Sequence, residues 1–353
     1  MKVDKQKIKK ISLYLFGLLV PYISIGLGFV LILLIPVTFY SNSNLDIKNN
    51  INSQIVYAQM GEENTIGGDV SVNFPLSKPL TPLARDNNSY DNVLTASSAF
   101  VMDVESKEVL YKKDENVVRP LASITKLMSA VTLLDFPINW SATTTILEED
   151  GNSDQHVQLG EVYTLDNLWK SGLIGSSNKA IKALVRSVGL NKEEFVSLMN
   201  KKAQELGLKS LHFTEPTGLS SQNVGNAHDT SLLLKEALRF DKIYTTLQIK
   251  EHYARDLNKE KVRRVWSTNW LITNWIKNDF RSGYVIGKTG YIPESNYNFV
   301  SSIVNNKNQQ QIIAIVLGAE TNEKRFEEVR DLSEWVFDRY VWPGDKGYSE
   351  LLE

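Results

Sequence analysis

A long uncharged run next to the N-terminus limits what this chain can fold into. Residues 11–40, ISLYLFGLLVPYISIGLGFVLILLIPVTFY, carry no charge, and residues 1–10, MKVDKQKIKK, contain five lysines and one aspartate. A membrane-spanning helix needs about 20 apolar residues, whereas the apolar part of a cleaved signal peptide has roughly 7–15. A buried core helix would show a polar face. Residues 11–40 are therefore predicted to form an uncleaved transmembrane signal anchor, with a cleavage site ending at Ala58 as the alternative.

The lysines indicate how this span is oriented. Basic residues before a first span keep that end in the cytoplasm. Residues 1–10 are therefore predicted to be a cytoplasmic tail, and the rest of the chain is predicted to lie outside the membrane. Residues 41–92 are rich in Asn, Ser, Gly and Pro and predict a flexible linker. A globular domain is predicted for residues 93–345, followed by a short tail at residues 346–353.

Composition narrows the function classes. The 353 residues carry a net charge of −2 and include no cysteine. Nucleic acid is therefore not an expected partner, and disulfides, thiol catalysis and thiolate-bound metals are excluded. His156, His212, His228 and His252 are scattered without an HExxH pattern, and Glu148–Asp150 is interpreted as a solvated acidic face. We therefore predict neither a metal site nor a cofactor.

The periodicity of the globular part predicts strands at both ends and helices between them. Apolar alternation and turn residues predict two hairpins, and helical spacing of apolar residues predicts the helices. Strands are expected at residues 97–103, 108–112, 298–304 and 310–318, and helices at residues 124–134, 165–172, 179–188, 192–206 and 323–342. This order favours an α+β fold, in which a sheet assembled from distant segments lies beside a helical lobe, with a cleft between them for a site.

The segment LASITKLM, residues 121–128, places Ser123 three positions before Lys126. Residues three apart share a helix face, and a neutral lysine can remove the proton that keeps serine a weak nucleophile. Burial or a nearby cation would lower the pKa of the lysine enough for this role. A helix N-terminus would also offer backbone N–H groups to an oxyanion. The alternative is an N-cap serine followed by a surface lysine, and Ser176 and Lys179 show the same spacing.

Two further motifs follow in the chain. GSSNKA places Ser176 and Asn178 one residue apart on a turn between two predicted helices, and GKTGY places Lys288 and Thr289 at the start of a strand. Each motif alone has a plain alternative, a capping asparagine or a strand with a surface lysine. Together, Ser-x-x-Lys, Ser-x-Asn and Lys-Thr-Gly in this order form the set found in penicillin-binding enzymes and serine β-lactamases. The order makes Ser123 the nucleophile and Ser176 part of the second motif.

With these motifs the chain resembles the low-molecular-mass penicillin-binding proteins of the D-alanyl-D-alanine carboxypeptidase family. The similarity runs from residue 97 to residue 341 and includes RPLASITKLMSA, QLGEVYTLDNLWKSGLIGSSNKA, LGLKSLHFTEPTGLS, STNWLI, GYVIGKTGY and IIAIVLGAE. The resemblance implies an antiparallel sheet flanked by helices and joined to a helical lobe, with the site between them. It also implies a bacterial membrane protein with an extracytoplasmic catalytic domain, the D-Ala-D-Ala end of peptidoglycan stem peptides as substrate, and β-lactam antibiotics as covalent inhibitors.

The resemblance also implies a role for each motif residue. Ser123 would attack the penultimate D-Ala carbonyl to form an acyl-enzyme, while Lys126 takes its proton. Ser176 would pass a proton to the leaving amine, and Asn178 would hold the substrate amide and orient Lys126. The residues implied in substrate binding are Lys288, Thr289, Gly290 and Tyr291 of the third motif and Arg325, which would lie near the substrate carboxylate. The backbone N–H groups of Ser123 and Tyr291 would form the oxyanion hole.

The sequence leaves alternatives to a membrane-anchored serine D,D-carboxypeptidase. A D,D-endopeptidase acting on peptidoglycan cross-links would use the same residues, and a catalytically inactive wall-binding module would keep the fold. A class A β-lactamase would need a deacylating glutamate, followed four residues later by asparagine, between the second and third motifs, and no glutamate there has that spacing. Three residues depart from the family pattern: Ser177 and Lys179 replace the usual Gly and Asp, and Glu215 replaces the usual Asn.

Overall fold

The computed structural model describes residues 80–151, 154–280 and 284–352. The predicted cytoplasmic tail, the predicted transmembrane span and most of the predicted linker lie outside the described residues. Within the described part of the chain, no helix combines the length and the apolar character needed to cross a membrane. The predictions for the N-terminal segments therefore stay predictions.

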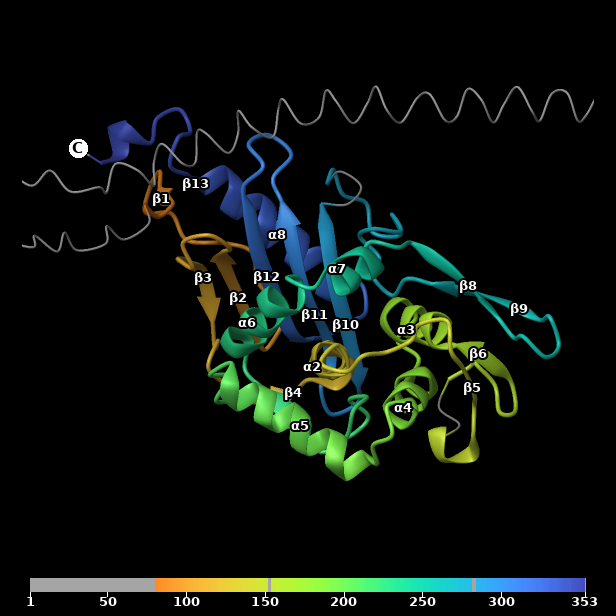
Figure 1. Ribbon diagram of the computed structural model, residues 1–353. Coiled ribbons are helices and arrows are strands. Elements are labelled where there is room, and N and C mark those ends of the chain that lie inside the picture. The colour runs from red at the N-terminus through yellow and green to blue at the C-terminus, as the bar shows by residue number, and fades with distance from the viewer. Residues whose placement is uncertain (1–79, 152–153, 281–283, 353) are drawn as a thin grey trace, which may run out of the picture. The chain divides into compact units, whose positions relative to one another are not determined.

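The centre of the described structure is a five-stranded antiparallel sheet (Figure 1). Its strand order is β10–β11–β12–β2–β3, so strands from the two ends of the domain pair in its middle, where Ala314 of β12 lies opposite Val101 of β2. The strands are β2 (Ser98–Asp103), β3 (Val109–Lys113), β10 (Val285–Ile292), β11 (Asn296–Val304) and β12 (Gln311–Ala319). Both expected hairpins are present, and the sheet is built from distant segments as predicted.

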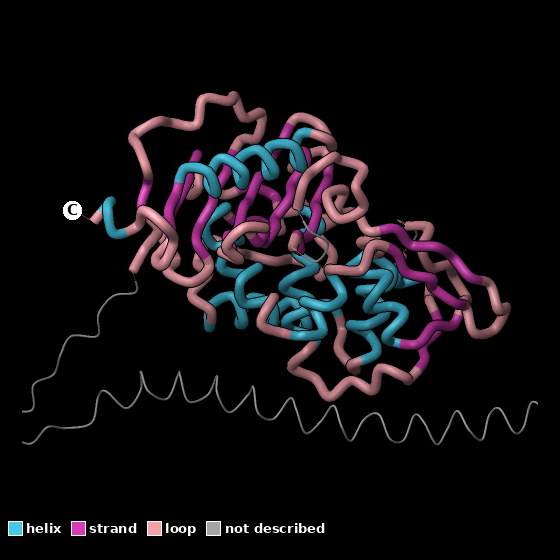
Figure 2. The backbone as a smooth tube through the Cα atoms, turned by 90° about the horizontal axis from the view of Figure 1, so that it is seen from above, coloured by secondary structure: helices cyan, strands magenta, loops and turns pink. Residues whose placement is uncertain are grey.

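Helices cover both faces of this sheet (Figure 2). On one face, α8 (Lys324–Arg339) packs against β11 and β12, and on the other face α6 packs against β2, β11 and β12. The helices on the side of α6 are α2 (Thr125–Leu133), α3 (Leu165–Ile174), α4 (Asn178–Ser187), α5 (Lys192–Glu205), α6 (Ala227–Ala237) and α7 (Asp241–Leu247). The prediction of a mixed fold of helices and strands is confirmed. The periodicity predicts neither α6 nor α7, nor the hairpin formed by β8 (Glu251–Arg255) and β9 (Val262–Trp266).

Short elements connect the larger ones and bring loops together. They are the strand pairs β1 (Leu83–Ala84) with β13 (Tyr340–Val341), β4 (Arg119–Pro120) with β7 (Val224–Gly225), and β5 (Thr143–Thr145) with β6 (Val162–Thr164), and the 3₁₀ turns η1 (Ala122–Ile124), η2 (Glu148–Asp150) and η3 (Ser349–Leu351). The pairing of β4 with β7 continues into η1, because the backbone N–H of Leu121 donates to the carbonyl of Asn223 at 2.8 Å. The chain that leads into α2 is thereby joined to the loop that precedes α6.

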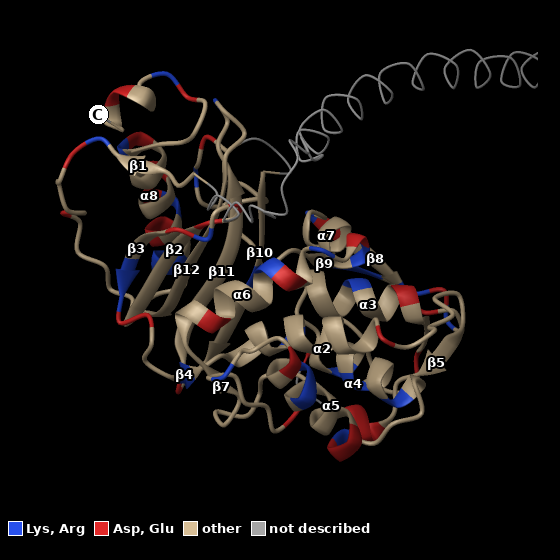
Figure 3. Cartoon of the chain, turned by 60° about the vertical axis from the view of Figure 1, so that its left-hand side comes forward, with Lys and Arg blue, Asp and Glu red and all other residues tan. Residues whose placement is uncertain are grey.

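The sheet is buried on both faces because side chains alternate along each strand. All six residues of β2 are buried. Phe100 and Met102 belong to the core shared with the helical lobe, whereas Ala99 and Val101 belong to the core under α8. Strands covered on both sides therefore read as continuous apolar runs in the sequence. By contrast, α5 lies at the edge of the helical lobe, where its charged residues gather (Figure 3).

Helix starts in the helical lobe depend on side-chain caps. Thr164 and Asn191 cap α3 and α5 by accepting backbone N–H groups, as their positions in the sequence predict. At α4 the cap differs from the expected one, because the Ser177 side chain accepts from the backbone N–H of Ala180. Asn178 is therefore the first residue of the helix and not its cap.

Candidate active site

Ser123 lies in a tight turn at the start of a buried helix. The turn η1 leads directly into α2, and every residue of α2 is buried. Ala122 has a φ of 50°, in the left-handed region that is unfavourable for a residue with a side chain. A close backbone contact holds this turn, since a Cβ added to Gly218 would lie 1.9 Å from the carbonyl oxygen of Ala122. Packing thus fixes the backbone that carries the Ser123 hydroxyl.

Lys126 lies one turn further along, with its amine among three oxygen atoms. Its Nζ lies 2.8 Å from Ser123 Oγ, 2.6 Å from Asn178 Oδ1 and 2.7 Å from the carbonyl oxygen of Thr217. The side chain is fully buried, and burial lowers its pKa to about 7, although the nearby Glu215 carboxylate favours the charged form. A neutral amine donates two hydrogens, here to Asn178 and Thr217, and keeps one lone pair. In this neutral form the lone pair is left for the Ser123 hydroxyl, as a general base requires, whereas the charged form donates to Ser123 Oγ.

The second motif reaches the same place from the turn between α3 and α4. Ser176 has a φ of 61°, and its Oγ accepts a hydrogen bond from Lys288 Nζ at 2.9 Å. A left-handed residue that is not glycine is a typical sign of a constrained functional turn. Because Asn178 follows two residues later and accepts from Lys126, this turn links both buried lysines of the site.

Asp154 supports the turn of the second motif from the loop before α3. Its carboxylate accepts from the Ser177 hydroxyl at 3.0 Å and from the backbone N–H of Lys179 at 3.0 Å. Ser177 is fully buried, and Lys179 is 4% exposed. The two residues that depart from the family pattern beside this motif therefore both bind one carboxylate, Ser177 through its side chain and Lys179 through its backbone.

The third motif faces this turn from the edge strand of the sheet. GKTGY, expected at the start of a strand, lies instead in the middle and the second half of β10. Lys288 is 1% exposed, and burial, together with the nearby cation of Lys126, lowers its pKa well below its ordinary value. The Thr289 hydroxyl donates to the Thr268 hydroxyl at 2.6 Å. This hydrogen bond ties the motif to the segment that follows β9.

Gly290 allows β10 to approach the nucleophile turn. A Cβ at this position would lie 2.6 Å from the carbonyl oxygen of Leu121, two residues before Ser123, so the close approach requires glycine. The next residue, Tyr291, has a side chain that is 49% exposed and stacks on Tyr297, with 4.4 Å between the ring centroids. The glycine brings the strand close, and the tyrosine lies at the open side.

Arg325 lies behind the third motif and is largely buried. Its Nη1 donates to the carbonyl of Gly290 at 3.1 Å and to that of Asn298 at 3.4 Å, and its Nη2 donates to Asn322 Oδ1. Burial lowers its pKa to about 10, so the guanidinium stays charged at neutral pH. The side chain therefore holds the backbone of β10 and β11 together at the motif. Its contact with a substrate carboxylate stays a prediction.

The structure brings the predicted motif residues together in one connected set. Lys126 joins Ser123 to Asn178, and Lys288 joins Ser176 to the edge strand. Their roles in chemistry stay predictions. Sequence reasoning missed Thr217, whose carbonyl reaches Lys126, as well as Asp154 and Thr268. Every residue has a backbone carbonyl, so the sequence does not show which one contacts Lys126. Only the turn residues EPTG indicated that the chain bends near Thr217.

The acidic run at residues 148–150 is a solvated face only in part, because Glu148 and Glu149 are exposed as predicted and Asp150 is buried. Asp150 is 1% exposed and accepts from Arg186 Nη2 at 3.0 Å, while Glu149 pairs with the same arginine from the surface. One buried ion pair thus fixes η2 against α4. Among the described residues, no three acidic or histidine side chains lie close enough to hold a metal ion.

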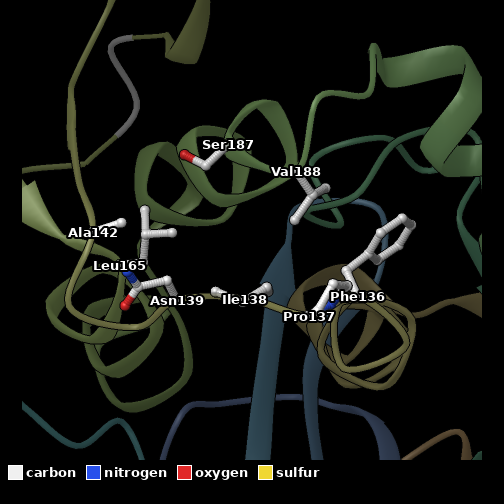
Figure 4. A pocket seen from close by; sticks show the side chains of 8 residues that line it. All are labelled: Phe136, Pro137, Ile138, Asn139, Ala142, Leu165, Ser187 and Val188. Atoms are coloured by element: carbon white, nitrogen blue, oxygen red, sulfur yellow. The ribbon is translucent and has the colours of Figure 1, made fainter.

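A separate cavity of about 330 Å³ lies away from the motif residues (Figure 4). It is lined by Phe136, Pro137, Ile138, Asn139, Ala142, Leu165, Ser187 and Val188, and thus lies between the ends of α2 and α4 and the start of α3. It contains no charged side chain and none of the motif residues.

Solved structures share this arrangement of elements. Penicillin-binding protein D2 from Listeria monocytogenes in its ampicillin-bound form is 26% identical, with a TM-score of 0.61, and the match covers 70% of this chain and 100% of that chain. The Streptomyces K15 DD-transpeptidase is 22% identical, with a TM-score of 0.64, and the match covers 71% of this chain and 100% of that one. At 22% identity, the match to the Streptomyces K15 DD-transpeptidase shows only that the two proteins share a fold.

Sequence comparison agrees with the structural one. The chain is 32% identical over 253 residues to D-alanyl-D-alanine carboxypeptidase DacF of Bacillus subtilis, covering 69% of this chain and 63% of that protein. It is 27% identical over 257 residues to the D-alanyl-D-alanine endopeptidase of Escherichia coli, covering 71% and 80%. Residues 85–321 match the family described as D-alanyl-D-alanine carboxypeptidase. Because this match covers more than half of the sequence, the chain belongs to the D-alanyl-D-alanine carboxypeptidase family.

Proposed function

We propose that this protein is a serine D,D-carboxypeptidase that removes the terminal D-Ala from peptidoglycan stem pentapeptides through an acyl-enzyme on Ser123. The observation that carries the proposal is the buried amine of Lys126, which lies 2.8 Å from Ser123 Oγ with a pKa lowered to about 7. Near neutral pH a large fraction of this amine is uncharged. It then accepts the serine proton without any other base.

In the acylation step, the Ser123 oxygen attacks the carbonyl carbon of the penultimate D-Ala while its proton moves to Lys126 Nζ. The negative charge that develops on the carbonyl oxygen would be bound by the backbone N–H groups of Ser123 and Tyr291. β10 is the edge strand of the sheet, so N–H groups on its outer side are not used by β11. The peptide C–N bond then breaks, and the proton passes through the Ser176 hydroxyl to the departing D-Ala nitrogen.

Deacylation uses the same groups with water as the nucleophile. Water attacks the acyl carbonyl carbon, gives one proton to Lys126, and the ester bond to Ser123 breaks as its oxygen regains a proton. The net reaction consumes one water and yields D-Ala and a tetrapeptide. The enzyme returns to its starting state. The Lys288 amine and the Thr289 hydroxyl, side by side on β10, are hydrogen-bond donors that support binding of the terminal carboxylate.

The test of this function is release of D-alanine from a synthetic pentapeptide by the full-length protein in detergent. The wild type is expected to release D-alanine and to be labelled by a fluorescent penicillin, whereas Ser123→Ala is expected to do neither. Equal release by both proteins would contradict the carboxypeptidase assignment. Penicillin labelling without any release would identify a protein that is acylated but does not turn over, and an absence of both would favour an inactive wall-binding module.

Endopeptidase activity is the second candidate, and one observation favours it. The Escherichia coli relative named D-alanyl-D-alanine endopeptidase is matched over 80% of its length, compared with 63% for the carboxypeptidase DacF. The two activities use the same acylation step but differ in whether the leaving amine belongs to free D-Ala or to a cross-linked side chain. Incubation with a purified cross-linked muropeptide dimer separates them, because an endopeptidase converts the dimer to monomers.

We also propose that residues 11–40 anchor the protein in the bacterial membrane, with the catalytic domain on the extracytoplasmic side. The uncharged run and the preceding lysines support this placement. The wild type is expected in the membrane fraction, and a variant lacking residues 1–40 is expected to lose that association. Protease added to intact cells after outer-layer removal should digest the domain, and full protection would contradict the orientation.

A further inference from the structure

One turn of the chain touches both reacting groups of the site. Gly218 packs on the nucleophile turn, because a Cβ there would lie 1.9 Å from the carbonyl oxygen of Ala122 and 2.8 Å from the backbone nitrogen of Ser123. One residue earlier, the carbonyl oxygen of Thr217 accepts from Lys126 Nζ at 2.7 Å. The turn at residues 215–218 is therefore in contact with the backbone of the nucleophile and with the amine of its base.

The carboxylate of Glu215 holds this turn in shape. Its Oε2 accepts from the backbone N–H of Thr217 at 2.8 Å and from the Thr217 hydroxyl at 2.5 Å. Its Oε1 accepts from the backbone N–H of Gly218 and from Asn223 Nδ2 at 3.0 Å. Four donors thus converge on one carboxylate, and two of them are backbone N–H groups of the turn. Charged acceptors bind such groups more strongly than neutral ones.

The same turn is also tied to the middle and to the start of α2. The Ser129 hydroxyl donates to the carbonyl of Pro216 at 2.5 Å. Asn223 Nδ2 donates to the backbone carbonyl of Glu215 at 2.8 Å and lies 3.2 Å from the Thr125 hydroxyl. The turn therefore cannot shift without moving α2, and its orientation decides where the Thr217 carbonyl points.

We propose that Glu215 is a positioning residue for the general base, which fixes the Thr217 carbonyl so that the lone pair of Lys126 faces Ser123. The inference rests on the proposed function, because it assigns a role within that acylation step. A neutral amine with only one fixed acceptor, Asn178, could rotate its lone pair away from the serine. When Asn178 Oδ1 and the Thr217 carbonyl both accept from the amine, only one direction is left for its lone pair. The Glu215 carboxylate fixes the Thr217 carbonyl in its place.

Glu215 also contributes charge to the balance at Lys126. The carboxylates of Glu215 and Asp154 favour the ammonium form and raise the pKa of Lys126, whereas the amine of Lys182 opposes it, and burial lowers the pKa further. Lys288 is the second buried lysine of this cluster, and burial, with the charges of Lys126 and Arg325, lowers its pKa well below the ordinary value. Removal of the Glu215 charge should therefore lower the pKa of Lys126, and removal of the Lys182 charge should raise it.

The experiment measures the second-order rate constant of acylation by a fluorescent penicillin from pH 5 to pH 9 on the full-length protein. In Glu215→Gln the maximal rate is expected to fall about tenfold, because the Thr217 carbonyl loses its fixed position. The midpoint of the acidic limb is expected to move to lower pH by about half a unit. Lys182→Gln should move the midpoint to higher pH with little change in the maximal rate.

The matched control is Glu328→Gln. Glu328 is another buried carboxylate that holds a chain segment, accepting from the backbone N–H of Thr95 at 2.6 Å and from that of Ala96 at 3.1 Å, but it belongs to α8, on the other face of the sheet. Its substitution should lower the melting temperature and leave the acidic midpoint unchanged. A purely structural role of Glu215 would give this same pattern and would overturn the proposal.

A second variant covers the case in which Glu215→Gln does not fold. Glu215→Asn introduces the residue usual in the family at this position, and it removes the charge and shortens the reach toward the backbone. It should show the same lower midpoint and a reduced maximal rate. An unchanged midpoint in both folded Glu215 variants would refute the inference alone, since the wild type would still be acylated. Failure of the wild type to react at Ser123 would instead refute the proposed function.

Discussion

The two faces of the central sheet differ in what their buried polar groups do. Toward the helical lobe, Lys126 and Lys288 are both buried and both have pKa values lowered by burial. On the opposite face, buried Glu328 of α8 accepts from the backbone N–H groups of Thr95 and Ala96 and so joins α8 to the chain that precedes β2. Burial that disfavours a charge is costly unless the group is used in its neutral form. The comparison teaches that burial on one face lowers the pKa values of two motif lysines, whereas on the other face a buried charge is stabilised by backbone N–H groups.

Replacement of the general base should give the largest difference between the two faces. Lys126→Met removes the amine from a fully buried site and replaces it with an apolar side chain, so the fold should persist. The acylation rate should fall by about 10³-fold, in the range of general-base contributions. On the other face, Phe326→Leu should lower the free energy of unfolding by about 1–3 kcal/mol and leave acylation unchanged. Penicillin labelling kinetics measure the acylation rate, and chemical denaturation measures the free energy of unfolding. Slow acylation by Phe326→Leu would contradict the expected difference between the two faces.

Two glycines with similar backbone angles give the next largest contrast. Gly218 has a φ of 89° and Gly189 a φ of 81°, but an added Cβ meets the Ala122 carbonyl at 1.9 Å in the first case and nothing within 4 Å in the second. Gly218→Ala should displace the nucleophile turn and slow acylation by about 10²-fold. Gly189→Ala should cost about 1 kcal/mol of stability through backbone strain and leave the rate as it is. Equal loss of activity in both would show that the contact at Ala122 is not what matters.

The pH dependence of acylation sharpens the comparison further. The pKa of Lys126 is lowered to about 7, so below that pH the amine becomes charged and the rate should fall about tenfold per pH unit. The unfolded chain binds this proton up to its ordinary pKa, so between pH 7 and about 10 the unfolded state holds the extra proton. The free energy of unfolding contributed by this group therefore rises with pH in that window. A denaturation series in which wild type and Lys126→Met change in parallel with pH would contradict the lowered pKa.

Two carboxylates in one loop should give the smallest effect. Asp154 binds the turn of the second motif and favours the charged form of Lys126, whereas Asp150 binds Arg186. Asp154→Asn should change the acylation rate by less than about tenfold and move its acidic midpoint to lower pH. Asp150→Asn should lower the free energy of unfolding by about 1–3 kcal/mol without altering the rate. If Asp150→Asn also moved the acidic midpoint of the acylation rate, the expectation that only Asp154 of these two acids influences Lys126 would be contradicted.

Much of the fold could be predicted from local pattern. The hairpins, α3 with its Thr164 cap and α5 with its Asn191 cap agree with the sequence, because alternation, helical spacing and capping side chains act over a few residues. α6 and α7 were not predicted, because the leucines of α6 stand in one consecutive run and α7 has only seven residues, so neither shows a clear helical spacing of apolar residues. The interpretation of Glu148–Asp150 as solvated is right for the exposed Glu148 and Glu149 and wrong for Asp150, because its partner Arg186 comes from a helix more than thirty residues further along.

The sequence by itself determined which residues could react, since Ser123, Lys126, Ser176, Asn178 and Lys288 stand in three ordered motifs whose spacing limits their chemistry. Only the tertiary structure decided the protonation state of the lysine and the direction of its lone pair. Both depend on burial and on acceptors from distant segments, among them a backbone carbonyl that looks the same at every residue. Desolvation and hydrogen-bond geometry are properties of the packed chain, which the order of residues specifies only through folding.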